Sequence, residues 1–146
     1  MKQELLDSCL KLKNGIITYS RAGGGAGSIL LIATNTNISL WIWCYWEIKK
    51  AGTILANADD DTTAMVGKIA VASRQLEGKR ISKVELAPLY YDLHIFLEDD
   101  YELVINCESQ PEGEDYPLNN WELSLEDLNI TYIVTCDFKI RKDTFR

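Results

Sequence analysis

The sequence predicts an α+β fold built mainly from antiparallel sheet, with two helices. Most apolar residues fall in short segments whose polarity alternates from one residue to the next, as it does in half-buried strands. Only two segments repeat apolar residues at helical spacing. The 146 residues are 47% hydrophobic, which is enough to bury a core of useful size. We therefore expect a single domain over residues 1–146.

The first part of the chain reads as one helix followed by strands. The helix is expected over 2–13, where one stripe is apolar, and it ends near Asn14-Gly15. The segment 38–48 has the strongest strand pattern, because its even positions are uniformly apolar and its odd positions include two tryptophans and a tyrosine. Shorter strands are expected at 16–20, 28–33 and 53–56.

The second part repeats this order. A helix is expected to begin at Asp59-Asp60-Asp61, because carboxylates cap free N–H groups, and to stop at Gly78. Glu98-Asp99-Asp100 is the predicted turn of a hairpin, and 108–120 is a polar, acidic loop too long for a simple turn. The predicted strands are 80–86, 92–97, 101–107, 121–124 and 130–137.

These two orders suggest a duplicated unit of one helix and a β-meander. The halves would be 1–57 and 58–146, each with a tryptophan near the end of its meander. Tyr45-Trp46-Glu47 in the first half then corresponds to Asn120-Trp121-Glu122 in the second. Trp46 and Trp121 are expected in the core.

The charges are distributed unevenly. From Val84 to Phe138 there are 14 Asp and Glu residues and no Lys or Arg, and the formal net charge of the chain is −7. Such a balance argues against binding to nucleic acid or to an anionic membrane, because both need a basic face. Acidic residues among strand-forming residues instead predict a folded surface of one sign, suited to a basic partner.

The outward-facing acids of this segment are expected at the hairpin tip and in the long loop. A surface without compensating cations is unusual for an ordinary soluble protein, which mixes both signs. The predicted contact residues are Glu98, Asp99, Asp100, Glu102, Glu112, Glu114 and Asp115.

Catalytic residues, metal ligands and cofactor motifs are not evident. Gly23–Gly27 precedes a strand and not a helix, so it fits a hairpin connection better than a phosphate loop. Asp59-Asp60-Asp61 lacks the alternation of a calcium loop, and the four cysteines lack zinc spacing. His94, the single histidine, has no recognisable partner, although pairs of carboxylates have no spacing rule that would reveal them. We therefore predict a protein that is not an enzyme, with no metal and no cofactor.

Trp41, Trp43 and Tyr45 occupy the less apolar face of the 38–48 strand and allow other functions. They could form the aromatic wall of an interface or lie under a second helix. A small-ligand module would use this face as a pocket wall, and a structural subunit would use it for self-association. These alternatives stay open beside a basic protein partner.

Four segments of the second half resemble a family. Leu76-Glu-Gly-Lys-Arg-Ile81, Tyr91–Phe96, Asp99–Ile105 and Asn120–Leu123 are similar to motifs of immunity-type proteins from bacterial polymorphic toxin and contact-dependent growth inhibition systems. Asp100 stands where the family usually has glycine. The resemblance implies a β-rich binding protein that is not an enzyme and that neutralises its own toxin domain, often a basic nuclease.

The expected location is the cytoplasm. The N-terminal residues lack the long apolar core of a signal peptide, and no apolar run approaches the length needed to cross a bilayer. Three of the four cysteines lie in apolar strand patterns, where a reduced cysteine behaves as a small hydrophobe.

Overall fold

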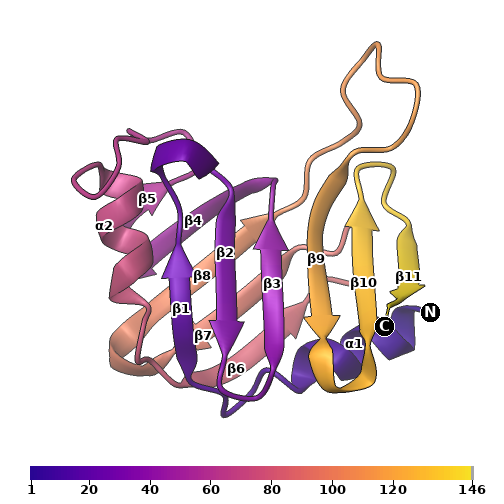
Figure 1. Cartoon of the computed structure of the whole chain (residues 1–146), viewed down its shortest axis with the longest axis horizontal. Coiled ribbons are helices and arrows are strands. Elements are labelled where there is room, and N and C mark those ends of the chain that lie inside the picture. Colours follow the sequence, from indigo (N-terminus) through magenta and orange to yellow (C-terminus); the bar gives the residue numbers. More distant parts are fainter. Residues whose placement is uncertain (146) are drawn as a thin grey trace.

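Two antiparallel sheets pack face to face in the computed structural model, which describes residues 1–145 (Figure 1). The predicted α+β class is confirmed. The six-stranded sheet has the order β1 (Ile17–Arg21), β2 (Leu30–Thr34), β3 (Ile38–Ile42), β9 (Asn119–Leu125), β10 (Ile130–Thr135) and β11 (Ile140–Thr144). The five-stranded sheet has the order β5 (Thr53–Asn57), β4 (Tyr45–Lys50), β8 (Tyr101–Asn106), β7 (Leu93–Leu97) and β6 (Ile81–Leu86).

Two short helices lie at opposite sides of the molecule. α1 (Lys2–Leu10) packs against β6 and lies behind the β9–β11 side of the six-stranded sheet (Figure 1). α2 (Lys68–Gln75) packs against β1 and β5. Neither helix of the described chain is long and apolar enough to span a membrane.

The two halves of the chain follow one plan. In the first half, α1 precedes a meander of β1 to β3 in the six-stranded sheet, and the chain then crosses to place β4 and β5 in the five-stranded sheet. In the second half, α2 precedes a meander of β6 to β8 in the five-stranded sheet, and the chain crosses back to place β9 and β10 in the six-stranded sheet. Among the strands of residues 1–145, only β11 has no counterpart.

Hydrogen bonds at the start of each meander are reciprocal. The N–H of Ile17 donates to the carbonyl of Lys79 (2.9 Å), and the N–H of Ile81 donates to the carbonyl of Gly15 (2.8 Å). The two tryptophans are also equivalent, since Trp46 donates its indole N–H to Ser28 O (2.7 Å) and Trp121 donates to Tyr91 O (3.0 Å). Each acceptor lies just before the second strand of its own meander.

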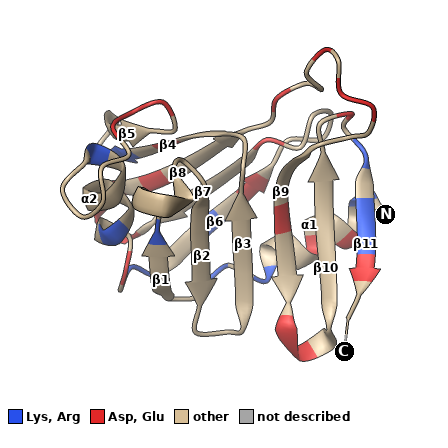
Figure 2. Cartoon of the chain, turned by 45° about the horizontal axis from the view of Figure 1, so that its top comes forward, with Lys and Arg blue, Asp and Glu red and all other residues tan. Residues whose placement is uncertain are grey.

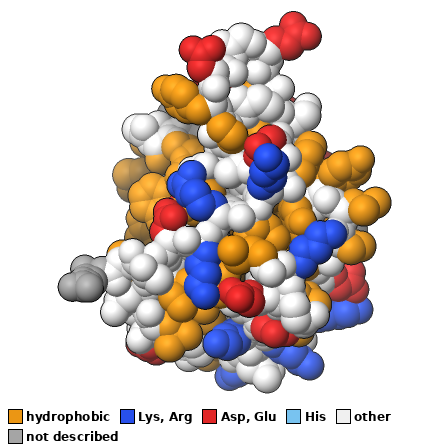
Figure 3. Space-filling model, turned by 90° about the vertical axis from the view of Figure 1, so that its right-hand side faces the viewer, with side chains coloured by type: hydrophobic (Ala, Val, Ile, Leu, Met, Phe, Trp, Pro, Cys, Tyr) orange, Lys and Arg blue, Asp and Glu red, His pale blue; other side chains and the backbone are white. Residues whose placement is uncertain are grey.

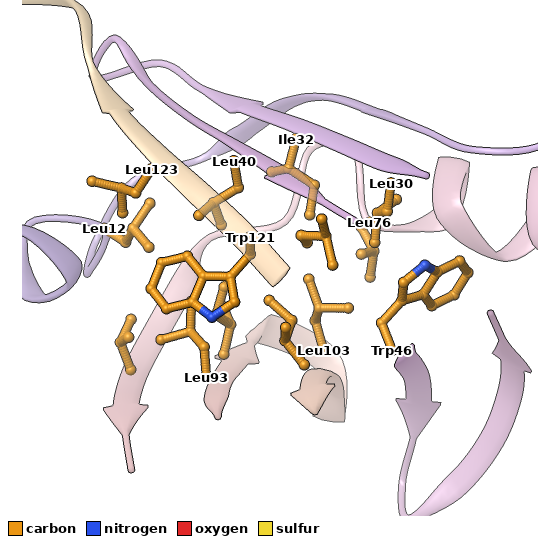
Figure 4. Close-up of a cluster of buried hydrophobic side chains, with 14 of the residues drawn as sticks. Leu12, Leu30, Ile32, Leu40, Trp46, Leu76, Leu93, Leu103, Trp121 and Leu123 are labelled. Carbon is orange, nitrogen blue, oxygen red and sulfur yellow. The ribbon is translucent and has the colours of Figure 1, made fainter. Parts of the chain in front are cut away.

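The core lies between the sheets, and the two tryptophans stand well apart within it (Figure 4). Both indole rings are fully buried, as the sequence predicts. Leucines and isoleucines from both halves pack around and between them; those labelled in Figure 4 are Leu12, Leu30, Ile32, Leu40, Leu76, Leu93, Leu103 and Leu123. The packing of these side chains is the main favourable contribution to folding.

The prediction of a single strand over 38–48 is wrong, because the chain changes sheets in its middle. β3 ends at Ile42 and β4 begins at Tyr45, so Trp43 and Cys44 form a corner. The N–H groups of both corner residues donate to the carbonyl of Asn120 (2.9 and 3.1 Å). The even positions stay buried on both sides of the corner, because the inner faces of the two sheets line the same core.

The predicted helix start at Asp59-Asp60-Asp61 is also wrong, since α2 begins only at Lys68. Asp60 and Asp61 instead accept hydrogen bonds within the preceding loop. Asp61 Oδ1 accepts from the hydroxyl (2.7 Å) and the N–H (2.9 Å) of Thr63, and these bonds lower the pKa of Asp61. The predicted stop at Gly78 is confirmed by its left-handed backbone, with φ at 85°.

The glycine-rich segment and the last strand lie at opposite edges of the six-stranded sheet, one as predicted and one not. Gly24–Ala26 forms a short 3₁₀ turn between β1 and β2, so this glycine segment is a connection between strands as predicted. The predicted strands omit β11, which is an exposed edge strand with Arg141, Lys142 and Asp143 in its centre. Charged residues are common on edge strands, because they discourage pairing with other chains.

Ser20 on β1 gives a simple test of the core. Its side chain is fully buried, and its hydroxyl has no hydrogen-bond partner within the described residues. We expect Ser20→Ala to leave the free energy of unfolding unchanged or to raise it by up to about 1 kcal/mol, because no bond is lost and an unsatisfied group is removed. Urea denaturation measures this.

The matched control is Thr34→Val, which also removes one buried hydroxyl. Thr34 Oγ1 donates to Ile38 O at 3.1 Å, so this change is expected to cost about 1 kcal/mol. A larger loss for Ser20→Ala than for Thr34→Val would contradict the placement of Ser20.

Candidate functional site

The seven predicted acidic contact residues fall into two groups at opposite ends of β8. Glu98, Asp99 and Asp100 form the turn before the strand, and Glu102 is its second residue. Glu112, Glu114 and Asp115 lie beyond its far end, in the loop that leads to β9 (Figure 2). Because the strand is roughly 20 Å long, the two groups do not form one surface.

Two of the four acids of the hairpin group pair with side chains from elsewhere in the chain. Asp99 forms an ion pair with Lys79 (2.6 Å), and this pair lowers the pKa of Asp99. Glu102 is hydrogen bonded to His94 Nε2 (2.8 Å) and lies opposite Lys49 in the sheet. Asp99 and Asp100 adopt the predicted left-handed backbone, with φ at 61° and 63°. The charge of this group is therefore partly compensated, by the ion pair between Asp99 and Lys79.

The second group is exposed and without ion pairs in the described chain. We call residues 107–118 the acidic loop. The side chains of Glu112, Glu114 and Asp115 are all exposed, and no Lys or Arg among residues 1–145 pairs with them. The loop projects from one end of the molecule, and Figure 2 shows acidic segments and no basic ones along the loop itself. On the face that Figure 3 shows, acidic side chains stand at this end, and the visible Lys and Arg side chains lie below it.

The base of the acidic loop is held by two side-chain amides. Asn120 is fully buried; its Oδ1 accepts from the N–H of Glu108 (2.9 Å), and its Nδ2 donates to the carbonyl of Glu108 (3.1 Å). Gln110 spans the loop by donating to Tyr116 O (2.8 Å) and accepting from the N–H of Leu118 (2.9 Å). The tip therefore projects from a fixed stem. Neither amide is among the residues predicted from the sequence, because a buried structural amide looks there like any loop residue.

The acidic loop is longer than this fold requires. It makes the crossing from β8 to β9, and the equivalent crossing in the first half, from β3 to β4, uses only Trp43 and Cys44. Loops that extend beyond the needs of a scaffold commonly carry function. The extra length here carries the unpaired carboxylates.

The aromatic residues divide differently from the sequence prediction. Trp41 and Trp43 are neighbours, with ring centroids 5.9 Å apart, and Trp41 is 43% exposed on the outer face of β3. Tyr45 belongs to the other sheet, where its hydroxyl donates to Glu47 (3.0 Å). The three residues therefore do not share one face, because the corner at Trp43 and Cys44 separates them.

Trp43 brings the aromatic pair next to the acidic loop. It lines a hollow of about 500 Å³ together with Glu108, Pro111 and Leu118 of the loop, and Cys136 closes another side. Tyr116, which is 72% exposed, lies in the same loop. We call Trp41, Trp43 and the acidic loop the acidic–aromatic surface. It offers negative charge beside flat apolar rings, a combination suited to Lys and Arg side chains.

Glu122 lies directly opposite Trp41 in the six-stranded sheet. Burial raises the pKa of this carboxyl, with Arg141 acting in the opposite direction. A raised pKa means that the folded protein ionises Glu122 less readily than the unfolded chain does. The contribution of Glu122 to stability is thus most favourable at low pH and is lost as pH rises from the ordinary value of 4.5 through the raised one.

This sign gives a testable prediction. We expect Glu122→Gln to raise the free energy of unfolding at pH 7 and to have little effect below pH ~3.5, where the wild-type carboxyl is protonated in both states. Urea denaturation across this pH range measures it. The control is Glu126→Gln on an exposed turn, which should change stability little at any pH. A stabilisation by Glu122→Gln that did not depend on pH would contradict this assignment.

His94 lies away from the acidic–aromatic surface. It is on the outer face of the five-stranded sheet, stacked on Phe96 with centroids 4.1 Å apart, and Glu102 is its hydrogen-bond partner. This partner cannot be identified from the sequence, because the two residues become diagonal neighbours only once β7 and β8 pair. Within residues 1–145, no group of three or more His, Cys, Asp or Glu side chains is arranged to hold a metal ion.

No family model matches this chain, and neither a curated protein nor a solved structure matches it.

Proposed function

We propose that this protein is a non-enzymatic binding protein that holds a basic protein partner at its acidic–aromatic surface. In its specific form, the proposal is that the chain is a cytoplasmic immunity protein of a bacterial toxin system. Its partner would be the cognate toxin domain, most simply a nuclease with a basic substrate path. Binding would cover that path and so prevent the toxin from reaching nucleic acid.

The acidic loop is the observation that supports this proposal. Its carboxylates have no ion-pair partners within residues 1–145, and its stem is fixed by Asn120 and Gln110. Fixed charges of one sign accelerate encounter with a partner of the opposite sign, and a fixed stem lowers the entropy lost on binding. The neighbouring Trp41 and Trp43 supply the aromatic area that commonly anchors protein interfaces.

A co-expression experiment tests the proposal. The gene immediately upstream would be expressed alone and together with this protein, and growth and complex formation would be measured. We expect the upstream product to inhibit growth alone, and the two proteins together to restore growth and to purify as a complex. An upstream product that neither inhibits growth nor binds would count against the immunity function.

The hollow beside Trp43 supports a second candidate function, a small-ligand module. Its volume of about 500 Å³ is within the range of small-molecule sites. Tyr45 would take no part, since it lies on the other sheet. A titration that follows tryptophan fluorescence, with Trp43→Phe as the control, separates this function from the first. Self-association through Trp41 would instead appear as a rise in scattering mass with concentration.

A further inference from the structure

Two cysteines face each other at the edge of the acidic loop. The pairing of β4 with β8 ends at Tyr45 opposite Asn106. Just beyond this pair, Cys44 precedes β4 and Cys107 follows β8. Their backbone N–H groups donate elsewhere, to Asn120 O (3.1 Å) and to Asp92 Oδ1 (2.7 Å). Opposed residues that exchange no backbone hydrogen bonds have Cα atoms about 4.5 Å apart, which is within the range that a disulfide spans.

Both thiols lie on the same side of the sheet. Cys44 continues the buried row of Trp46 and Ile48, and Cys107 continues that of Leu103 and Ile105. The neighbouring Cys107 thiol and the burial of Cys44 both raise the pKa of Cys44. The two side chains are therefore close enough to bond without a change of strand register.

The two thiols differ in exposure. Cys44 is only 3% exposed, whereas Cys107 is half-buried. Cys9 is fully buried on α1, and burial raises its pKa to about 12. Cys136 is 6% exposed, and burial raises its pKa as well. A reagent in solution thus reaches Cys107 first, and Cys44 is the thiol beside it.

We propose that Cys44 and Cys107 form a reversible thiol-modification site that is oxidised to a disulfide by small disulfides such as oxidised glutathione. The Cys107 thiol loses its proton to solvent, and its sulfur attacks one sulfur of the small disulfide. The S–S bond of the reagent breaks, one small thiolate leaves and takes up a proton, and a mixed disulfide remains on Cys107.

The second step completes the exchange. Cys44 loses its proton to solvent, its sulfur attacks Cys107 Sγ, and the second small thiolate leaves and is protonated. Two protein thiols are thereby oxidised, and one small disulfide is reduced to two thiols. The new bond joins the β3–β4 corner to the end of β8, at the foot of the acidic loop. This site does not depend on the proposed partner.

The test uses the purified wild-type chain with oxidised glutathione, followed by alkylation of the remaining thiols and peptide mapping without reductant. We expect two of the four thiols to be lost, with Cys44 and Cys107 in one linked peptide that dithiothreitol separates. Cys9 should become accessible to the alkylating reagent only after denaturation. This protection would show that the protein stayed folded during the reaction with oxidised glutathione. The oxidised form should also unfold at higher urea concentration, because the bond restricts the unfolded chain.

Two variants sharpen this result. Cys44→Ser should stop the reaction at a stable glutathione adduct on Cys107. Cys107→Ser should leave the Cys44 thiol unmodified by oxidised glutathione. The proposal would be overturned by a persistent adduct on Cys107 in the wild-type chain, by a bridge to Cys136, or by retention of all four thiols.

Discussion

Replacing Trp121 with alanine is expected to lower the free energy of unfolding by about 3–5 kcal/mol. The indole is fully buried between the sheets, so the change removes a large apolar side chain and leaves a cavity (Figure 4). It also removes the donor to Tyr91 O, an acceptor that would keep only the weak bond from Cys107 Sγ (3.4 Å). Because whole domains are stable by only about 5–15 kcal/mol, this variant should be close to unfolded at 37 °C.

Trp46 and Trp41 provide the comparison for this prediction. Trp46→Ala should have an effect of similar size, because Trp46 occupies the equivalent position in the first half and is equally buried. Trp41→Ala should cost less than about 1 kcal/mol, because its ring is 43% exposed. Equilibrium urea denaturation measures all three. A loss below about 1.5 kcal/mol for Trp121→Ala would contradict the packing of this core.

Neutralising the acidic loop is expected to slow association with a basic partner on the order of tenfold at low salt. The variant is Glu112→Gln, Glu114→Gln and Asp115→Asn, which removes three exposed charges and changes side-chain size little. The effect should fall mainly on the association rate and should shrink as salt is added, because mobile ions screen exposed charges. Stopped-flow kinetics against the co-expressed partner measures it.

The hairpin supplies a control of equal charge. Glu98→Gln, Asp99→Asn and Asp100→Asn remove the same three charges from the opposite end of β8 and keep residues that tolerate the left-handed backbone. This variant should associate at a rate within about twofold of the wild type, since the hairpin lies at the opposite end of β8 from the proposed contact surface and Asp99 is already paired with Lys79. Equal slowing by both variants would show that the association rate depends on the net charge of the protein and not on the position of the charges in the acidic loop.

The sequence predicts the class of fold well because local patterns determine it. The alternation of polar and apolar residues predicts ten of the eleven strands of residues 1–145 in type and approximate place, although it joins β3 and β4 into one. The alternation does not reveal the corner at Trp43 and Cys44. Even-numbered residues are buried in the same core both before and after it. β11 is missed for the opposite reason, since a charged edge strand has little apolar alternation to detect.

The candidate surface is harder to predict because charge compensation is not local. The acidic segment contains no Lys or Arg, yet Lys79 lies across the hairpin from Asp99 once β6 and β7 pair. No such partner reaches Glu112, Glu114 or Asp115 from the rest of residues 1–145. Only the fold separates these two acidic groups, and only the fold places Trp43 against the acidic loop.

An NMR titration of the ¹⁵N-labelled protein with the upstream gene product tests the central claim most directly. If the acidic–aromatic surface binds the partner, the largest shift changes will fall on residues 107–118 and on the indole N–H signals of Trp41 and Trp43. The indole signals of the buried Trp46 and Trp121 should move little and serve as internal controls. The largest changes at Glu98–Glu102, with the acidic loop unmoved, would contradict the claim.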